Sequence, residues 1–222
     1  EPTGCLEAQS FTSGLRPDGT SPFSQDGICI HRGLGGAGFS ELTIVPDAGV
    51  VKLDPDIPLD IACVIGCAVQ TGVGAVFNSA RVEVGSTVFV TGLGGIGISI
   101  VQGARIAGAG KIIVSDPVAE RREAAIHFGA TYTINPDEDE VVPKVLEETK
   151  AIGVDYAFEA AGVASLVDTC INASRIGGTT VIVGADASLS TVQILPVLIA
   201  TMGKKIIGSL LGDCHPQRAL PN

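Results

Sequence analysis

Near the middle of the chain stands Val88-Phe89-Val90-Thr91-Gly92-Leu93-Gly94-Gly95-Ile96-Gly97, and its pattern dictates the architecture around it. The first four residues are β-branched or aromatic, a composition typical of a buried strand. The glycines that follow match the pattern G-x-G-x-x-G, and the residues beyond them repeat their apolar positions at helical spacing. A strand, a glycine-rich turn and a helix in this order predict a βαβ unit whose turn accepts a pyrophosphate.

Each glycine of this turn has its own predicted role. Gly92 permits the tight turn, Gly94 lets the backbone approach a pyrophosphate, and Gly97 lets the helix pack closely on the strand. Gly95 and Ile96 lie at the helix N-terminus, which faces the phosphate charge. The pattern alone is weak evidence, since 29 of the 222 residues are glycine and it can arise by chance. The strand before it and the helix after it supply the context that the motif requires.

Strands and helices continue to alternate toward the C-terminus. The strands are apolar on both faces, which indicates a parallel sheet covered by helices on both sides. We therefore predict an α/β fold, with a Rossmann-type, doubly wound parallel sheet over residues 66–222. The expected strands are 88–91, Ile112–Val114, Thr131–Ile134, Tyr156–Phe158, Thr180–Val183 and Lys205–Ile207, and the expected helices are Ile96–Ala107, Ala119–Phe128, Glu138–Lys150 and Ala164–Ala173.

An acidic residue follows the second predicted strand. Asp116 stands 19 residues after Gly97, where a carboxylate accepts the hydroxyls of an adenosine ribose. It would repel a 2′-phosphate at close range, so NAD is preferred over NADP. The alternative is that Asp116 only caps the next helix. Arg121 and Arg122 either lean over the adenosine, which weakens the exclusion of NADP, or lie at the solvated surface.

The composition excludes several classes of protein. The net charge is −10 and no basic stripe is visible, so we expect no nucleic-acid partner. The longest uncharged run, between Glu83 and Arg105, is long enough to span a membrane. It contains six glycines and its apolar period changes at Gly92, so we expect no membrane partner. The six cysteines are too widely spread for a disulfide scaffold, which indicates a reducing cytoplasm.

Several motifs, in order along the chain, carry a resemblance to a known family. They are Gly38-Phe39-Ser40-Glu41-Leu42-Thr43, Gly66-Cys67-Ala68-Val69-Gln70-Thr71-Gly72-Val73-Gly74-Ala75-Val76, the glycine-rich turn, Asp155-Tyr156-Ala157-Phe158-Glu159, Gly177-Gly178-Thr179-Thr180-Val181-Ile182-Val183-Gly184 and Gly208-Ser209-Leu210-Leu211-Gly212. Through them the chain resembles the zinc-dependent medium-chain alcohol dehydrogenases. Within that family it is similar to the branch of classical alcohol and glutathione- or mycothiol-linked formaldehyde dehydrogenases.

The resemblance implies a division of the chain and a set of metal ligands. Residues 1–65 would be part of a mostly β, GroES-like catalytic domain, joined through a helical linker at about 60–80 to the NAD-binding domain. Cys67 matches the last of three protein ligands of a catalytic zinc. Taken alone, Cys67 and Cys63 are equally well read as buried thiols; the resemblance makes Cys67 a ligand and leaves Cys63 as core filler. Cys5 matches one ligand of a structural zinc whose other cysteines would lie upstream.

The resemblance also implies an activity. Thr71 matches a nicotinamide contact, and Ile96, Val183 and Leu211 match positions at the nicotinamide end. The full-length enzyme would pass a hydride from a zinc-bound alcohol, or from a hydroxymethyl-thiol adduct, to NAD, giving an aldehyde or a thioester. We expect a homodimer or homotetramer, joined through the edge strand near 205–208, while the 222 residues themselves lack the other zinc ligands. The alternatives are a non-catalytic NAD-binding fragment and a zinc-free quinone or enoyl reductase.

Overall fold

The computed structural model describes residues 13–16, 18–32, 38–39, 41–43, 45, 50–185 and 190–219. The chain divides into two compact units, one formed by residues 1–56 with 215–222 and the other by residues 57–214. The predicted boundary at 65/66 falls inside the second unit, and the assignment of catalytic and NAD-binding roles to the two parts stays a prediction.

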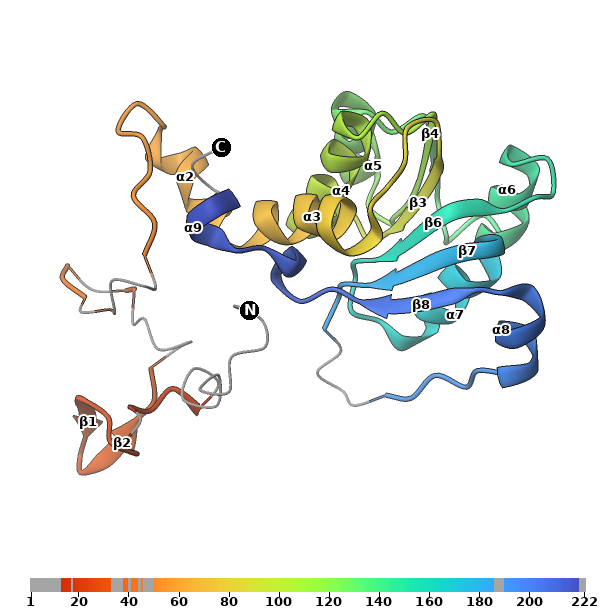
Figure 1. The fold of residues 1–222 in the computed structure, drawn as a ribbon. Helices are drawn as coiled ribbons and strands as arrows, with labels where there is room; N and C mark the ends of the chain where they lie inside the picture. The colour runs from red at the N-terminus through yellow and green to blue at the C-terminus, as the bar shows by residue number, and fades with distance from the viewer. Residues whose placement is uncertain are drawn as a thin grey trace. The chain divides into compact units, whose positions relative to one another are not determined.

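The second unit is built on a parallel sheet of six strands (Figure 1). The strand order is β5-β4-β3-β6-β7-β8, and every neighbouring pair is parallel. From the central β3 the chain adds strands in one direction and then, from β6, in the other, so the order reverses between β3 and β6. This confirms the predicted doubly wound fold. The strands are β3 Thr87–Thr91, β4 Lys111–Ser115, β5 Tyr132–Ile134, β6 Val154–Glu159, β7 Ser174–Ile182 and β8 Lys205–Gly208.

The helices that connect these strands begin and end close to their predicted bounds. α5 (Ala119–Phe128) and α7 (Ala164–Ala173) match the prediction residue for residue, and α4 spans Gly95–Ile106. α6 (Val141–Glu148) is shorter than the predicted 138–150, because Glu138 and Asp139 donate their N–H groups to the Asn135 carbonyl in a turn before the helix. The sequence pattern did not predict α8 (Pro196–Met202), which begins at a proline and ends at Gly203 in the left-handed conformation.

Two separate hydrophobic cores explain why the strands lack a polar face. Val88 and Val90 pack with the buried side chains of α4 and α5. Phe89, between them in sequence, packs on the opposite face with Val145 of α6 and Cys170 of α7. Successive side chains of a strand point to opposite faces, so a sheet covered on both sides needs apolar residues at every position.

A long helical run precedes the sheet. It consists of α2 (Leu59–Val64), a π-helical segment (Ile65–Val69), α3 (Gln70–Gly74) and a second π-helical segment (Ala75–Ala80), at the place of the predicted helical linker. Among the described residues this run is the one helix long and apolar enough to cross a membrane, a test that the core helix of a soluble protein also passes. α3 packs so closely against α4 that only a glycine fits at position 72: a Cβ there would lie 2.5 Å from the Ile96 carbonyl oxygen.

The other unit contains less regular structure among its described residues. β1 (Phe23–Gln25) and β2 (Ile28–Ile30) form an antiparallel hairpin. Asp26 and Gly27 connect them, and both have positive φ, the backbone conformation of a two-residue hairpin turn. The short helix α9 (Pro216–Ala219) belongs to this unit.

Candidate functional site

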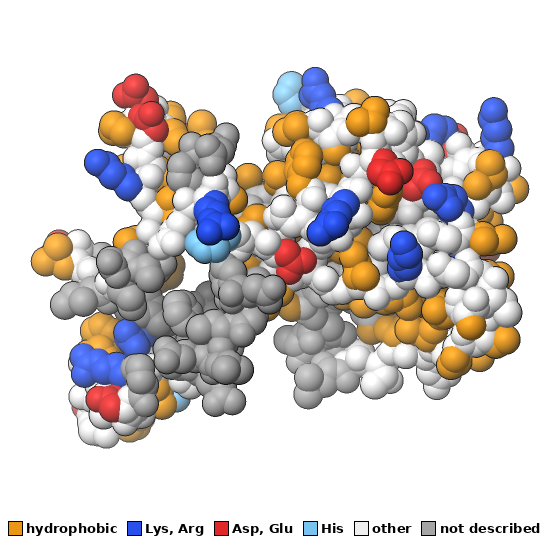
Figure 2. Space-filling model, in the orientation of Figure 1, with side chains coloured by type: hydrophobic (Ala, Val, Ile, Leu, Met, Phe, Trp, Pro, Cys, Tyr) orange, Lys and Arg blue, Asp and Glu red, His pale blue; other side chains and the backbone are white. Residues whose placement is uncertain are grey.

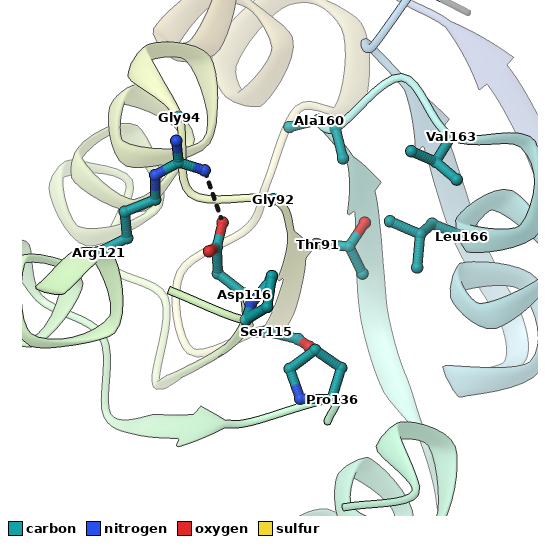
Figure 3. Close-up of a pocket in the computed structure, with 12 residues that line it drawn as sticks. Thr91, Gly92, Gly94, Ser115, Asp116, Arg121, Pro136, Ala160, Val163 and Leu166 are labelled. Atoms are coloured by element: carbon teal, nitrogen blue, oxygen red, sulfur yellow. Dashed lines mark ion pairs between the residues drawn. The ribbon is translucent and has the colours of Figure 1, made fainter. Parts of the chain in front are cut away.

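A pocket of about 390 Å³ lies where the strand order reverses, at the carboxyl ends of β3, β4 and β6 (Figure 3). Open α/β sheets bind their ligands at such a point, because the connecting loops separate there. Four of its residues were predicted from the sequence, namely Gly92, Gly94, Asp116 and Arg121. The other residues that line it are Thr91, Ser115, Pro117, Pro136, Ala160, Ala161, Val163 and Leu166.

The glycine-rich turn forms one end of this pocket. Gly92 has a φ of +82°, and a Cβ there would lie 2.7 Å from the Cβ of Ala161. A Cβ on Gly97 would lie 1.8 Å from the Gly92 carbonyl oxygen. By contrast, a Cβ on Gly94, which precedes α4, would meet nothing within 4 Å. The chain therefore needs Gly92 and Gly97 for its own packing, whereas Gly94 leaves space beside the helix N-terminus for an anionic ligand.

Asp116 ties this turn to the next strand. Its side chain is 2% exposed. The Leu93 N–H donates to its Oδ2 (2.7 Å), and the Val118 N–H donates to its Oδ1 (2.9 Å). Because Val118 is the residue immediately before α5, Asp116 does bind the start of that helix, as the alternative reading held. It also lines the pocket, so its role in capping the helix leaves room for the predicted contact with a ribose, which stays a prediction.

Two arginines of α5 approach Asp116 in different ways. Arg121 Nη1 lies 3.5 Å from Asp116 Oδ2, and its side chain is 53% exposed (Figure 3). Arg122 Nη1 donates to the carbonyl oxygens of Asp116 and Pro117, at 2.7 and 2.8 Å. Arg122 thus fixes the backbone at the end of β4, while Arg121 brings a positive charge to the rim of the pocket.

Sequence reasoning missed the walls of the pocket and the residue behind one of them. Ala160, Ala161, Val163 and Leu166 follow β6 and line the pocket with apolar side chains. Glu159, at the end of β6, is 1% exposed, and its Oε1 accepts N–H groups from the loop that follows. The signal for these residues was their place after a buried strand, since parallel strands present their carboxyl ends at one edge.

The predicted nicotinamide-end residues do not line this pocket, and three of them meet around α3. A Cβ on Gly72 would contact the Ile96 carbonyl, and a Cβ on Gly212 would lie 2.8 Å from the Thr71 carbonyl. α3 therefore adjoins both the start of α4 and the turn that contains Leu211. The Thr71 hydroxyl is buried and has no hydrogen-bond partner among the residues that the structure describes. Val183 lies apart, directly after β7, where its N–H donates to the Glu159 carbonyl.

The described residues do not form a zinc site. No three His, Cys, Asp or Glu side chains within the described ranges lie close enough together to hold a metal ion. Cys67 is exposed in the π-helical segment Ile65–Val69 and by itself cannot fix zinc. The prediction that Cys63 is core filler is wrong, because this thiol is exposed and its Sγ donates to the Asp60 carbonyl. Cys5 lies outside the described residues.

The cysteines are expected to differ sharply in reactivity. Burial raises the pKa of the Cys170 thiol to about 12 and also raises the pKa of Cys214. Iodoacetamide at pH 8 should modify Cys63 and Cys67 in the native protein and spare Cys170 and Cys214 until the chain unfolds. Peptide mass mapping checks the labelling, and equal labelling rates for Cys170 in native and unfolded protein contradict this prediction.

The buried Cys170 thiol should also make stability depend on pH. As the pH rises above 9.0, the ordinary pKa of a thiol, unfolded Cys170 loses its proton while folded Cys170 keeps it, so the free energy of unfolding should fall.

Comparison with known proteins agrees with this geometry. The sequence model of the family described as zinc-binding dehydrogenase matches residues 95–221, from the start of α4 to almost the end of the chain. This chain belongs to the zinc-binding dehydrogenase family. The predicted resemblance is therefore confirmed.

Individual members of the family resemble most of this chain. The S-(hydroxymethyl)glutathione dehydrogenase of Synechocystis sp. is 38% identical over 210 residues, which cover 94% of this chain and 57% of the relative. An alcohol dehydrogenase zinc-binding domain protein from Burkholderia ambifaria superimposes with a TM-score of 0.90 at 33% identity, over 98% of this chain and 59% of its own. A zinc-binding dehydrogenase from Sinorhizobium meliloti 1021, bound to NADP, gives 0.62 at 33% identity, over 65% and 43%. The matched segment thus covers less than two thirds of each relative's own length, from 43% to 59%.

Proposed function

We propose that residues 57–214 bind NAD and that the complete protein is a zinc- and NAD-dependent alcohol dehydrogenase. The observation that supports this best is the meeting of a G-x-G-x-x-G turn, a helix N-terminus and Asp116 in one pocket. The turn and the helix N-terminus fit the pyrophosphate of a dinucleotide, and Asp116 fits its adenosine ribose. Their common location at the switch point of the sheet is what separates this motif from a chance run of glycines.

The parts of NAD would be held as follows. The pyrophosphate lies beside Gly94, where the first N–H groups of α4 lack partners within the helix. The adenosine ribose hydroxyls donate to the Asp116 carboxylate, and the adenine lies between the apolar walls formed by Pro117, Pro136 and Leu166. A carboxylate at this position disfavours a 2′-phosphate, and Arg121 offsets part of that repulsion. We therefore expect NAD to bind more tightly than NADP, although one structural relative holds NADP.

The reaction itself is proposed for the complete protein. NAD supplies the hydride acceptor, and the substrate is a small alcohol or the hydroxymethyl adduct of a thiol, as the name of the Synechocystis relative suggests. Thr71, Ile96, Val183 and Leu211 would contact the nicotinamide. The Thr71 hydroxyl, which has no hydrogen-bond partner within the described ranges, would form a hydrogen bond to it. Cys67 would be one catalytic zinc ligand and Cys5 one structural ligand, with the remaining ligands supplied by segments that relatives of greater length possess.

A second candidate is an NAD-binding module without turnover. It is favoured because the described residues hold no group of three His, Cys, Asp or Glu side chains that could bind a metal ion around Cys67. A zinc-free quinone or enoyl reductase is less well supported, because such an enzyme has no need of a thiolate at Cys67. Zinc content measured after incubation with excess zinc and dialysis distinguishes these cases. One or two tightly bound zinc ions per chain, together with NAD-dependent alcohol oxidation, support the dehydrogenase, and NAD binding without zinc supports the module.

We further propose a cytoplasmic homodimer or homotetramer with no nucleic-acid partner. β8 is the last strand of the sheet and pairs with β7 alone among the described strands. Near it, Ile194, Leu195 and Val197 are exposed, and Figure 2 shows hydrophobic side chains gathered over the region of β8 and α8 at the lower right. An unpaired edge beside apolar side chains favours pairing with a second copy. On the face drawn, Lys and Arg side chains are scattered rather than arranged in a stripe.

Direct binding tests the proposal. Isothermal titration should show that NAD and ADP-ribose each bind the chain with a stoichiometry of one. NADP should bind about tenfold more weakly than NAD, because repulsion between the Asp116 carboxylate and the 2′-phosphate costs roughly 1.4 kcal/mol of binding free energy. ADP-ribose is included because the pocket holds the adenosine half and does not depend on the zinc ligands. Heat from neither NAD nor ADP-ribose, in protein shown to be folded by circular dichroism, contradicts the proposal.

A further inference from the structure

We propose that Glu159 is a positioning residue for the dinucleotide, which it serves by fixing the loop that walls the adenosine side of the pocket. This inference rests on the proposed NAD binding. Glu159 is the last residue of β6 and is 1% exposed. It is absent from the pocket lining, so it acts through its neighbours rather than by touching the ligand.

The side chain of Glu159 holds the loop by a cluster of hydrogen bonds to one atom. Its Oε1 accepts the N–H groups of Ala161, Gly162 and Val163, at 2.9, 2.8 and 3.3 Å. Ala161 and Val163 line the pocket. Ala161 also lies against Gly92, because a Cβ on that glycine would approach the Ala161 Cβ to 2.7 Å. The carboxylate therefore sets the position of the wall relative to the glycine-rich turn.

The main chain of Glu159 holds a second loop. Its carbonyl oxygen accepts the N–H groups of Val183 and Gly184, both at 2.9 Å, directly after β7. A Cβ on Gly184 would lie 2.1 Å from the Gly162 nitrogen and 2.7 Å from Glu159 Oε2, so the two loops pack together at this residue. Glu159 thus connects the adenosine wall with the segment that carries Val183, the proposed nicotinamide contact.

The choice of a carboxylate has a physical reason. Three N–H groups that converge on one point need a strong acceptor, and an ionised oxygen makes hydrogen bonds about twice as strong as a neutral one. An unpaired buried N–H is costly, so the loop keeps this shape only while the acceptor is present. Because the loop covers Glu159, an anionic dinucleotide meets neutral backbone and apolar side chains instead of the negative charge.

The test compares Glu159→Gln with Glu147→Gln, which removes an equal charge from the exposed face of α6. In Glu159→Gln we expect affinities for NAD and ADP-ribose to fall about tenfold, as the loss of one charged acceptor allows. Hydrogen exchange of the Ala161–Val163 amides should accelerate, while amides of β3 and β4 keep their rates. Glu147→Gln should change none of these quantities. A purely structural role would instead accelerate exchange throughout the sheet.

The outcomes separate this inference from the proposed function. A folded Glu159→Gln protein that binds ADP-ribose as tightly as wild type overturns the positioning role. If that variant does not fold, the wild-type protein decides: its loop amides from 161 to 163 must exchange slowly without ligand, and fast exchange there overturns the inference. If wild type binds neither NAD nor ADP-ribose, the proposed function fails, and loop exchange in the two variants alone decides whether Glu159 fixes the wall.

Discussion

Gly97→Ala should destabilise the nucleotide-binding unit by about 3 kcal/mol or more, a cost typical of forcing backbone apart in a packed core. The new Cβ would lie 1.8 Å from the Gly92 carbonyl oxygen and 2.9 Å from its carbonyl carbon. Both are backbone atoms of the turn between β3 and α4, so no side-chain rotation relieves the clash. The helix must move away from the strand, and α4 then loses its packing on Val88 and Val90. Urea unfolding followed by circular dichroism measures the loss.

Gly94→Ala is the matched control for this prediction. The same methyl group at Gly94 meets no protein atom within 4 Å, so the free energy of unfolding should change by less than about 1 kcal/mol, the usual range for this exchange at a helix start. Its affinity for NAD should nevertheless fall at least about tenfold, because the methyl occupies the space through which the pyrophosphate approaches the backbone. Equal loss of stability in Gly94→Ala and Gly97→Ala would show that the turn is not built as described.

Asp116→Asn should change the preference for NAD over NADP by about 100-fold, combining a weaker hold on the ribose hydroxyls with the removal of charge repulsion toward a 2′-phosphate. The amide has nearly the shape of the carboxylate but presents an N–H₂ group. One of the bonds from Leu93 and Val118 must therefore be lost, and some loosening of the turn is expected as well. With the negative charge gone, Arg121 is free to pair with the phosphate.

Titration of both cofactors into wild type, Asp116→Asn and Asp168→Asn measures this change. Asp168 is exposed on α7, where its carboxylate accepts from Asn172, so its replacement controls for net charge. The wild-type preference should be retained in Asp168→Asn. Unchanged NAD affinity in Asp116→Asn, together with no gain for NADP, would remove Asp116 from the cofactor site.

The sequence by itself determined the sheet, the turn and the acidic residue. Strands apolar at every position predict burial on both faces, because side chains alternate between the two cores, as Val88 and Phe89 do. The bounds of two helices, Ala119–Phe128 and Ala164–Ala173, were predicted without error. Gly92, Gly94, Gly97 and Asp116 were identifiable because their spacing along one βαβ unit is a local property of the chain.

Only the tertiary structure decided what surrounds those residues. Pro136 follows β5, whereas Ala161 and Leu166 follow β6, and nothing in their local sequence shows that the winding of the sheet brings them to one pocket. The sequence pattern does not distinguish Glu159 from the other acidic residues. In the structure it is buried, and its Oε1 accepts three N–H groups that only the folded chain directs to one point. Local pattern fixes period and spacing, whereas convergence of distant segments depends on how the whole sheet is wound.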